Sequence, residues 1–520
     1  MESGDWPAIR NAETALQRGV RDPDLSNLAA WGCLRRGETD AAIAILEAAL
    51  EFAPSHVVTL ANLAGLLRQK GRLRDAILLC DRAIAADRDS VQAWLERAFV
   101  LDAARSSDNA RISYSEVVRI DPSCAAALAG LASLAAREGN VDEGRNVAER
   151  ALAIEPGNFV AAAALATIEL ESGQAARAKA VLESILSDLD QPSADRSLAL
   201  NLLGDAHVKL RETADAFAAY AQSKADFRDI HKHMFVGQES SVAPIEAIIA
   251  GITVHEPALK RALGKSQPVN SAANHLFLLG YPRSGNTLCE NILASLPGVV
   301  AIEERPTLDM VDHTFPIMAD GAAKFAKADE AVLNRLRQAY WDKVEATGHS
   351  VRNRCLVDMD PLKSLRLPVI ARLFPEARVI IMRRDPRDVV WSCFRSNFAL
   401  SNAAMAFTTL ESTARHYDAV MRLTEAALAL LPIKAHVVRY DSLVREFEQC
   451  TRTLCEFAGL QWSPQLIRFD HTARTRGVTT ASAKQVRKPL YDGTRQWEPY
   501  ARYLAEVMPT LAPWVERFGY

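Results

Sequence analysis

The stretch FLLGYPRSGNTL, residues 277–288, carries residue types that can hold a phosphate group. A run of strand-forming residues ends at Gly280, four residues separate it from Gly285, and Thr287 follows. Glycines after a buried strand let the backbone turn tightly and aim several N–H groups at an anion, and the amino end of the next helix adds a favourable dipole. The spacing therefore predicts an anion-binding loop between a strand and a helix.

Two features separate this loop from the Walker A loop of nucleoside triphosphatases, whose spacing it nearly matches. Asn286 stands where that loop has its lysine, and no downstream aspartate is evident as a partner for Mg²⁺. Arg283 offers a cation from the amino-terminal side instead. We therefore expect phosphate binding without a metal ion; an ordinary turn with glycines is the plain alternative.

A second loop with the same potential is MRRDPRDVVWSCFRSNF, residues 382–398. It follows another run of strand formers, it is rich in arginine, and Ser392 comes eight residues after Arg384. A helix that begins near Pro386 would place Ser392 two turns into it. A solvated basic turn is the plain alternative, but the pairing with the first loop favours a second anion site.

Two anion sites at adjacent strand ends suggest a nucleotide with two separate phosphate groups. Together the loops resemble those of the sulfotransferase family, above all the protein-tyrosine sulfotransferases and their bacterial relatives with tetratricopeptide repeats, over about residues 274–520. The resemblance implies 3′-phosphoadenosine 5′-phosphosulfate (PAPS) as co-substrate, 3′-phosphoadenosine 5′-phosphate (PAP) as product, and no metal. It assigns the 5′-phosphosulfate to Pro282, Arg283, Ser284, Gly285, Asn286 and Thr287, and the 3′-phosphate to Arg384 and Ser392.

The resemblance also implies a catalytic base. The segment GVVAIEERPTL contains Glu303 and Glu304, and Glu304 matches the base of the tyrosine sulfotransferases. The chemistry needs such a group, because a hydroxyl must lose its proton as it attacks sulfur, and a carboxylate within hydrogen-bond reach can accept that proton. A solvated helix start with favourable dipole placement is the plain alternative for both residues.

Further residues receive roles from the same resemblance. Arg283 is implied to bind the sulfonate and bridging oxygens, and Ser482 to help the leaving group. Tyr440 is implied to lie near the nucleotide, with Arg487 and Lys488 adding charge near the 3′-phosphate.

The sequence departs from the family in the element VDMDPLK. Met359 stands where relatives carry a lysine that supports the transferring sulfonate, and a thioether supplies no cation. Lys363, four residues on, would share a helix face with Met359 if a helix began there, and is the candidate substitute. A second gap is Gln496, where relatives carry a cation. These changes leave open a slower enzyme, an altered acceptor, rewired charges or loss of activity.

The elements that must position these residues form an α/β pattern from His275 onward. HLFLLGY, ARVIIMRRD and AHVVRYDSL read as strands that run into loops, with helical segments between them. Strands that alternate with helices predict a parallel sheet covered by helices. Ligands of such sheets sit at the carboxyl ends of the strands, which is where the proposed loops lie.

The first half of the chain repeats with a period of 34 residues. Gly37, Gly71, Gly139 and Gly173 fall on one grid with Arg105 in the vacant slot; small residues form a second grid at Ala42, Ala76, Ala110, Gly144 and Ala178; and Pro54, Pro122 and Pro156 fall on a third with Arg88. The pattern resembles the tetratricopeptide repeat: glycine ends one helix in the left-handed conformation, the small residue admits a close second helix, and proline suits the first turn of the next helix. Such solenoids bind peptides or proteins in a concave groove.

Length and composition set the remaining bounds. The chain has 520 residues and a formal net charge of −3, which gives no reason to expect nucleic acid as a partner. Its start lacks the pattern of a signal peptide, and no stretch approaches the roughly 20 apolar residues of a membrane span. The 8 cysteines are scattered, which favours reduced thiols in the cytoplasm.

We therefore predict an all-α tetratricopeptide-repeat solenoid followed by an α/β, P-loop-like sulfotransferase domain with a parallel sheet. The expected bounds are a lead-in at 1–24, repeats at 25–226, a helical connector at 227–270 and the sulfotransferase domain at 271–520.

The leading function is PAPS-dependent transfer of a sulfonate to a hydroxyl, with a protein tyrosine as the first acceptor to consider and repeats that bind a protein or the acceptor. A glycan, a lipid or a small metabolite stays open as acceptor. The alternatives are a repeat scaffold with a catalytically impaired domain and a degenerate nucleoside-phosphate kinase. The oligomeric state and the partner of the repeats are not predicted.

Overall fold

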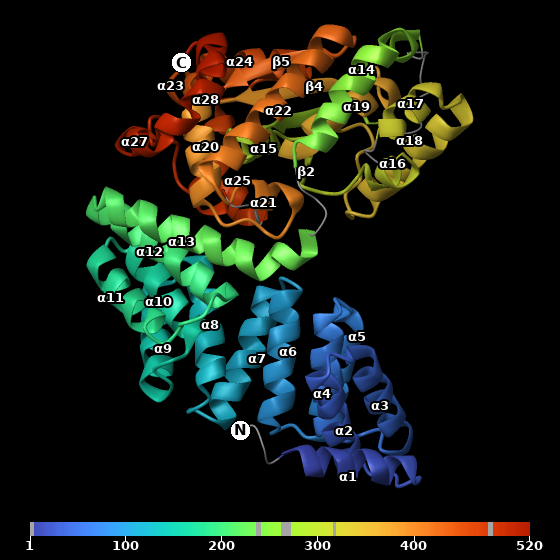
Figure 1. Ribbon diagram of the computed structural model, residues 1–520, viewed down its shortest axis with the longest axis vertical. Coiled ribbons are helices and arrows are strands. Elements are labelled where there is room, and N and C mark those ends of the chain that lie inside the picture. Colours follow the sequence, from blue (N-terminus) through green and yellow to red (C-terminus); the bar gives the residue numbers. More distant parts are fainter. Residues whose placement is uncertain (1–4, 236–240, 262–271, 316–318, 477–481) are drawn as a thin grey trace. The chain divides into compact units, whose positions relative to one another are not determined.

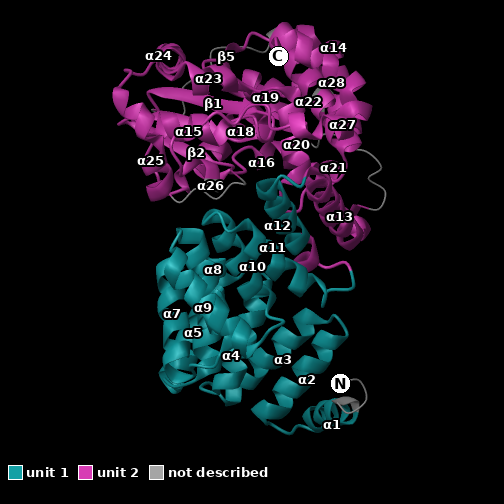
Figure 2. Cartoon of the chain, turned by 90° about the vertical axis from the view of Figure 1, so that its left-hand side faces the viewer, with its two compact units in different colours: residues 1–191, 198–212 teal, residues 192–197, 213–520 magenta. Residues whose placement is uncertain are grey.

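The computed structural model describes residues 5–235, 241–261, 272–315, 319–476 and 482–520. Contacts divide the chain into one compact unit of residues 1–191 and 198–212 and a second of residues 192–197 and 213–520 (Figure 2). This division falls before the helix α13 (Thr213–His231), whereas the sequence placed the end of the repeats at residue 226. Residues 1–4 of the predicted lead-in and residues 236–240 and 262–270 of the predicted connector lie outside the described residues.

The first unit is built of antiparallel helices that follow the 34-residue grid (Figure 1). Gly37, Gly71, Gly139 and Gly173 all have positive φ, between 75° and 80°, and Arg105 adopts the same conformation with a φ of 60°. The first grid therefore marks left-handed turns, as predicted. The helices are α1 Asp5–Gln17, α2 Pro23–Arg35, α3 Thr39–Phe52, α4 Val57–Gln69, α5 Leu73–Ala86, α6 Val91–Ala103, α7 Ser107–Ile120, α8 Ala125–Glu138, α9 Val141–Ile154, α10 Phe159–Glu171, α11 Ala175–Leu186 and α12 Ala194–Leu210.

The structure confirms the expectation for the second grid but not the one for the third. The small residues of the second grid are buried: Ala42, Ala76, Ala110 and Ala178 have no exposed surface, and a Cβ on Gly144 would lie 2.6 Å from Ile168 Cδ1. The position expected for the prolines of the third grid, in the first turn of the next helix, is wrong. The prolines do not stand in the first turn of the next helix but in the turns before α4, α8 and α10, where their fixed φ helps to end the preceding helix. The predicted lead-in contains α1, which packs on α2.

The second unit contains the predicted parallel sheet, with five strands in the order β2-β3-β1-β4-β5. Every pairing is parallel, so the carboxyl ends of the strands meet at one edge. The central strand β1 pairs Leu278 with Met359 of β3 on one side and with Ile380 of β4 on the other. The strands are β1 Asn274–Gly280, β2 Val299–Glu303, β3 Cys355–Met359, β4 Arg378–Arg383 and β5 Lys434–Arg439.

Helices cover both faces of this sheet (Figure 1). On one face, alternate strand residues such as Leu278 and Ile380 form a core with α15, α24 and α25. On the other face, Phe277 packs against the rings of Tyr340 on α18 and Phe374 after α19. The helices from α15 on are α15 Asn286–Ala294, α16 Asp309–Thr314, α17 Ala319–Lys327, α18 Glu330–Glu345, α19 Leu367–Leu373, α20 Pro386–Arg395, α21 Asn402–Ala406, α22 Leu410–Leu430, α23 Tyr440–Arg445, α24 Phe447–Ala458, α25 Phe469–Arg476, α26 Ala483–Val486, α27 Ala501–Leu504 and α28 Met508–Phe518, with 3₁₀ turns η2 Pro361–Arg366, η3 Pro464–Arg468, η4 Glu498–Tyr500 and η5 Ala505–Val507.

Two helices that precede the sheet belong to the same unit. Phe217 on α13 stacks on Tyr503 with ring centroids 3.8 Å apart and also contacts Trp391 of α20. The helix α14 (Ala243–Arg261) packs against α17 and α22, and the 3₁₀ turn η1 (Lys232–Phe235) extends α13. A fragment that lacked α13 and α14 would therefore leave apolar surface of the second unit uncovered.

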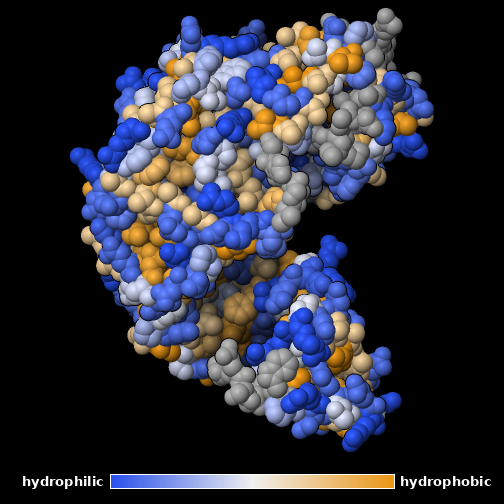
Figure 3. Space-filling view, in the orientation of Figure 1, coloured by the Kyte–Doolittle hydropathy of each residue, from blue (hydrophilic) through white to orange (hydrophobic). Residues whose placement is uncertain are grey.

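The surface of the chain is mixed in character. On the face drawn in Figure 3, hydrophobic residues lie scattered among hydrophilic ones in both units. Among the described helices, none is both long enough and apolar enough to cross a bilayer. The 8 cysteines are all unpaired.

Arg105 tests the physical reading of the repeat grid. Its side chain is exposed, and its left-handed backbone costs a residue with a Cβ about 1–2 kcal/mol. Because glycine is more flexible in the unfolded chain, Arg105→Gly should raise the free energy of unfolding by only about 0.5–1 kcal/mol. Urea unfolding followed by circular dichroism measures this change.

Gly71→Ala is the matched control, because Gly71 has a φ of 75° and open space around its Cα. This variant should lower stability by about 1 kcal/mol. A loss of stability in Arg105→Gly would contradict the equivalence of the two turns.

Candidate active site

The loop that leaves β1 has the tight geometry expected of an anion-binding turn. A Cβ on Gly280 would lie 2.6 Å from Asn286 Oδ1 and 3.0 Å from the backbone of Met382, so only glycine fits there. Gly285 has a φ of 102°, and a Cβ on it would lie 2.8 Å from the ring of Tyr440. The two glycines thus let the loop turn close to β4 and to the residue that follows β5, and α15 begins directly after Gly285.

Arg283, within this loop, carries a buried positive charge. Its backbone has a φ of 69°, which is strained for a residue other than glycine. Among the described residues, its guanidinium donates only to neutral oxygens: Ser392 Oγ at 3.0 Å, Gln485 Oε1 at 2.9 Å, and Ser482 Oγ. Burial, reinforced by the charge of Arg395, lowers the pKa of Arg283 to about 10, which still leaves it protonated at neutral pH. The arrangement favours a bound anion.

Arg384 and Ser392 line the same pocket as Arg283. The helix α20 begins at Pro386, and Ser392 on it accepts the hydrogen bond from Arg283. Arg384 donates to the carbonyl oxygens of Arg283 at 3.1 Å and Gly493 at 2.6 Å, and its guanidinium stacks over the ring of Tyr440 at 4.7 Å. Its Nε is buried without a hydrogen-bond partner in the described structure, so this side chain keeps a donor for a ligand.

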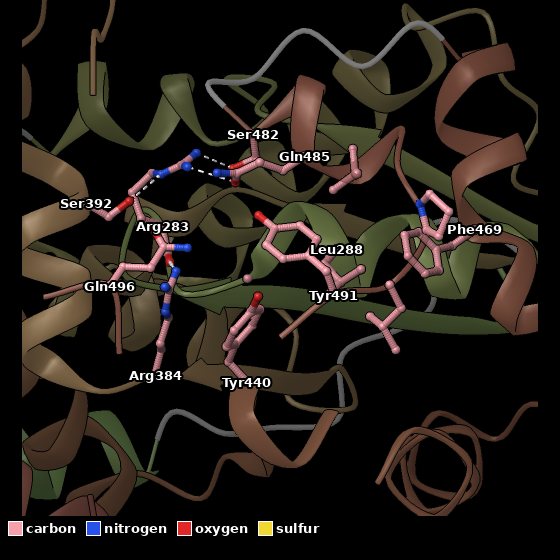
Figure 4. A pocket seen from close by; sticks show the side chains of 14 residues that line it. Arg283, Leu288, Arg384, Ser392, Tyr440, Phe469, Ser482, Gln485, Tyr491 and Gln496 are labelled. Atoms are coloured by element: carbon pink, nitrogen blue, oxygen red, sulfur yellow. Dashed lines mark hydrogen bonds between the residues drawn. The ribbon is translucent and has the colours of Figure 1, made fainter. Parts of the chain in front are cut away.

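These side chains line one pocket that encloses about 550 Å³ of empty space, counting space open to solvent. In Figure 4, polar groups gather at one end of it, around Arg283, Arg384, Ser392 and Gln496, whereas Leu288 and Phe469 lie toward the other end. The pocket therefore suits a ligand with anionic groups and an apolar, flat portion. Its lining residues are Arg283, Gly285, Leu288, Arg384, Ser392, Tyr440, Phe469, Ser482, Gln485, Val486, Pro489, Leu490, Tyr491 and Gln496.

Glu304 lies directly after β2, at the same edge of the sheet. Its backbone has a φ of 47°, and its N–H donates to the carbonyl of Met359 at 2.7 Å. Loss of hydration, followed by the negative charges of Asp360 and Glu303, raises the pKa of Glu304 to about 7, while the charge of Lys363 opposes the rise. The residue keeps more than a third of its surface exposed, so it is open to a reactant and solvent screens its neighbours.

Lys363 is placed differently from the expectation. Met359 is the last residue of β3 and fully buried, and Lys363 belongs to the 3₁₀ turn η2 that begins at Pro361, so the two do not share a helix face. A strand end, Asp360 as cap and Pro361 separate the two positions. The ammonium of Lys363 forms an ion pair of 2.5 Å with the buried Asp358.

Of the remaining predicted site residues, some form the loop after β1, some line the pocket, and some do neither. Pro282, Ser284, Asn286 and Thr287 form the loop and the start of α15 but do not line the pocket. The Ser284 N–H closes the turn onto the Tyr281 carbonyl at 3.1 Å, and the Asn286 amide donates to the same carbonyl at 2.8 Å, so both act within the loop.

Tyr440 and Ser482 line the pocket, while Arg487 and Lys488 do not; the chain there contributes Val486 and Pro489 to the wall instead.

The sequence did not single out Gln485 or Tyr491 as site residues. Gln485 lies three positions after Ser482 on α26, so both can reach the same guanidinium. The sequence could have indicated Gln485 by this three-residue spacing from Ser482. For Tyr491 we find no comparable signal. Gln496 was noted as a missing cation, and it accepts a hydrogen bond from Arg395 at 2.7 Å, which brings another cation next to the pocket wall.

Known families match both units. The sequence model of the sulfotransferase family matches residues 275–464, and models of the tetratricopeptide repeat match residues 34–98, 100–159 and 135–200.

An uncharacterized protein of Aquifex aeolicus is 28% identical over 72% of this chain, which spans only 48% of that relative. Protein-tyrosine sulfotransferase 1 of Danio rerio is 26% identical over 47% of this chain and 72% of its own length. The pilus biogenesis factor PilW covers 39% of this chain, at 19% identity and a TM-score of 0.36. The chain therefore carries a sulfotransferase-family domain, distantly similar to the protein-tyrosine sulfotransferases, after a series of tetratricopeptide repeats.

Proposed function

We propose that this protein transfers the sulfonate of PAPS to an acceptor hydroxyl. The observation that carries the proposal is the buried guanidinium of Arg283, held by neutral partners in a pocket that also contains Arg384 and Ser392. A buried cation without a counter-charge is costly, and a bound anion removes that cost. A second cation with an unused donor at the same pocket calls for a ligand with two anionic groups, as PAPS has.

The order of the strands gives the bound nucleotide a direction. Glu304 follows β2, the loop with Arg283 follows the central β1, and Arg384 follows β4. A donor that lies along this edge therefore has its sulfonate toward Glu304 and its 3′-phosphate toward Arg384. The apolar end of the pocket, with Leu288 and Phe469, suits the adenine base.

The chemistry in this arrangement divides among few residues. Glu304 takes the proton of the acceptor hydroxyl as its oxygen attacks sulfur. Arg283 holds the oxygens whose negative charge grows as the bond to the leaving phosphate breaks, and the Ser482 hydroxyl, which is within reach of Arg283, supports the same oxygens. Two donors fixed before the reaction begins need little rearrangement during it.

A protein tyrosine is the acceptor we propose first, with the repeats binding a protein partner or the acceptor. The similarity to protein-tyrosine sulfotransferases supports the first part, and the tetratricopeptide repeats support the second. If PAP binds but neither a tyrosine peptide nor a simple phenol is sulfonated, other hydroxyl acceptors and then a catalytically impaired scaffold are the next hypotheses.

The first prediction concerns ligand preference. PAP should raise the melting temperature more than AMP does, because only PAP offers a 3′-phosphate to Arg384 and Ser392. A ligand at 100 times its dissociation constant adds about 2.7 kcal/mol of stability. Differential scanning fluorimetry with PAP, AMP and ATP measures the order without added Mg²⁺.

The matched variant is Ser392→Ala, which removes one hydroxyl from the pocket and should narrow the difference between PAP and AMP. Equal shifts with the two nucleotides in the unchanged protein would contradict the assignment of the 3′-phosphate site.

The second prediction concerns Glu304 and pH. Because the base must be deprotonated to act, kcat/KM should fall as the pH drops through about 7, the raised pKa of Glu304, rather than near the value of about 4.3 of an unperturbed glutamate. Glu304→Gln keeps the shape but removes the base, so turnover should fall about 10²- to 10⁴-fold with PAP affinity nearly unchanged. Transfer of labelled sulfonate from PAPS to a phenol or a tyrosine peptide measures both effects.

Glu303→Gln is the control, since adjacent residues point in different directions and only one can readily face the donor. A Glu304→Gln protein that binds PAP and turns over at the normal rate would remove Glu304 as the base.

A further inference from the structure

A buried polar cluster lies behind Glu304, with the carboxylate of Asp358 at its centre. Asp358 sits one residue before the end of β3 and has no exposed surface. It accepts hydrogen bonds from three elements: Lys363 Nζ of η2 at 2.5 Å, Thr307 Oγ1 after β2 at 2.8 Å, and Tyr340 Oη of α18 at 3.1 Å. All three donors are buried, so the cluster is shielded from solvent.

The cluster holds the backbone on the carboxyl side of Glu304. Lys363 Nζ donates to the carbonyl of Arg305 at 3.0 Å, and the Thr307 N–H donates to the same carbonyl at 2.8 Å. On the other side, the Glu304 N–H is fixed to the end of β3. A residue with a φ of 47° is strained and keeps this conformation only when its surroundings hold it there.

The contacts of Lys363 differ from those of a cation that serves a ligand. Two of the three N–H groups of its ammonium have protein acceptors, and its charge is balanced by Asp358. Arg283, in contrast, has only neutral partners among the described residues. A buried lysine that already has a carboxylate partner gains less from an added anion than an uncompensated arginine does.

We propose that Lys363 and Asp358 form a positioning pair that holds Glu304 in its left-handed conformation, and that Lys363 does not replace the lysine missing at Met359 as a cation on the sulfonate. This inference rests on the proposed role of Glu304 as the base.

Lys363 also affects the pKa of the proposed base. The positive charge of Lys363 opposes the rise in the pKa of Glu304, so its removal raises that pKa further. The titratable and charged groups around Glu304 are Asp358, Asp360, Lys363, Glu303 and Glu290.

The experiment compares the pair with a matched control. Removal of one member of a buried ion pair is strongly destabilising, so Asp358→Asn and Lys363→Gln are made singly and together. The double variant keeps the shape and the hydrogen-bonding capacity without the two charges. Tyr340→Phe is the control, because it removes a bond to the same carboxylate while Lys363 stays in place.

The double variant should bind PAP within about twofold of the normal affinity, because none of its changes lines the nucleotide pocket. Its kcat should fall about 10- to 100-fold. In Lys363→Gln alone, the acid limb of the pH profile should move upward, because this variant loses the positive charge that opposes the raised pKa of Glu304. Tyr340→Phe should lower the melting temperature but leave the acid limb in place. Asp358→Asn alone should also lower kcat, because Lys363 loses its anchor.

A different result overturns the proposal. If Lys363 served the sulfonate directly, its release from Asp358 in Asp358→Asn would leave kcat unchanged or raise it. If Lys363 had no effect on the base, the acid limb would not move in Lys363→Gln. Either outcome contradicts the positioning role.

The position of Glu304 is also read without turnover, by ¹³C NMR titration of labelled glutamate carboxyls, with its signal assigned by its loss in Glu304→Gln. If the unchanged protein binds PAP but transfers no sulfonate, the proposed function fails. The titration of Glu304 still tests whether Lys363 and Asp358 position it. An unshifted Glu304 titration in Lys363→Gln would overturn the inference.

Discussion

A guanidinium buried at the carboxyl edge of a parallel sheet, with no carboxylate partner among the described residues, is the constraint on which the second unit depends. An unbalanced buried charge is expensive, and here neutral oxygens from α20 and α26 reduce that cost only in part. The loop after β1, the serine of α20 and the start of α26 must therefore converge on Arg283. The same convergence closes the walls of the pocket, so the groups that tolerate the charge also create the place where an anion relieves it.

Tyr440 links this charge to the backbone around it. A Cβ on Gly285 would lie 2.8 Å from the ring of Tyr440, and a Cβ on Gly493 would lie 2.7 Å from its hydroxyl oxygen. Arg384 lies over the same ring and donates to the carbonyls of Arg283 and Gly493. One aromatic side chain after β5 thus fixes the distance between two loops and the direction of the second arginine. This explains why glycine is needed at positions where the sequence suggested only freedom for a turn.

Several features were predictable because they depend on local spacing. The grid of glycines required left-handed turns every 34 residues, and Arg105 in the vacant slot adopts that conformation even though it has a Cβ. Likewise, Ser392 comes eight positions after Arg384, and both line one pocket, because a strand end, a helix that starts at a proline and two helical turns leave little choice of direction. Patterns of this kind are decided by backbone geometry within one or two elements.

Features that depend on tertiary packing were not predictable in the same way. The helix face proposed for Met359 and Lys363 does not exist, since β3 continues through Met359 and Asp360 caps a 3₁₀ turn. No sequence pattern placed α13 with the second unit, because its ring contacts with Trp391 and Tyr503 join distant segments.

Two of the buried cations at this edge, Arg283 and Lys363, have partners of different kinds. Arg283 is surrounded by neutral oxygens, so its charge remains available to something that enters the pocket. Lys363 lies next to Asp358, so its charge is used within the fold and its effect outside is limited to the neighbouring carboxyl of Glu304. Burial and residue type alone do not distinguish these roles, because both side chains are almost fully enclosed. The distinction comes from the partner: a cation with a carboxylate supports structure, and a cation with neutral partners is prepared for an anion. By this criterion, Lys363 does not repair the loss of a lysine at Met359, and in the proposed function the uncompensated positive charge on the donor is that of Arg283.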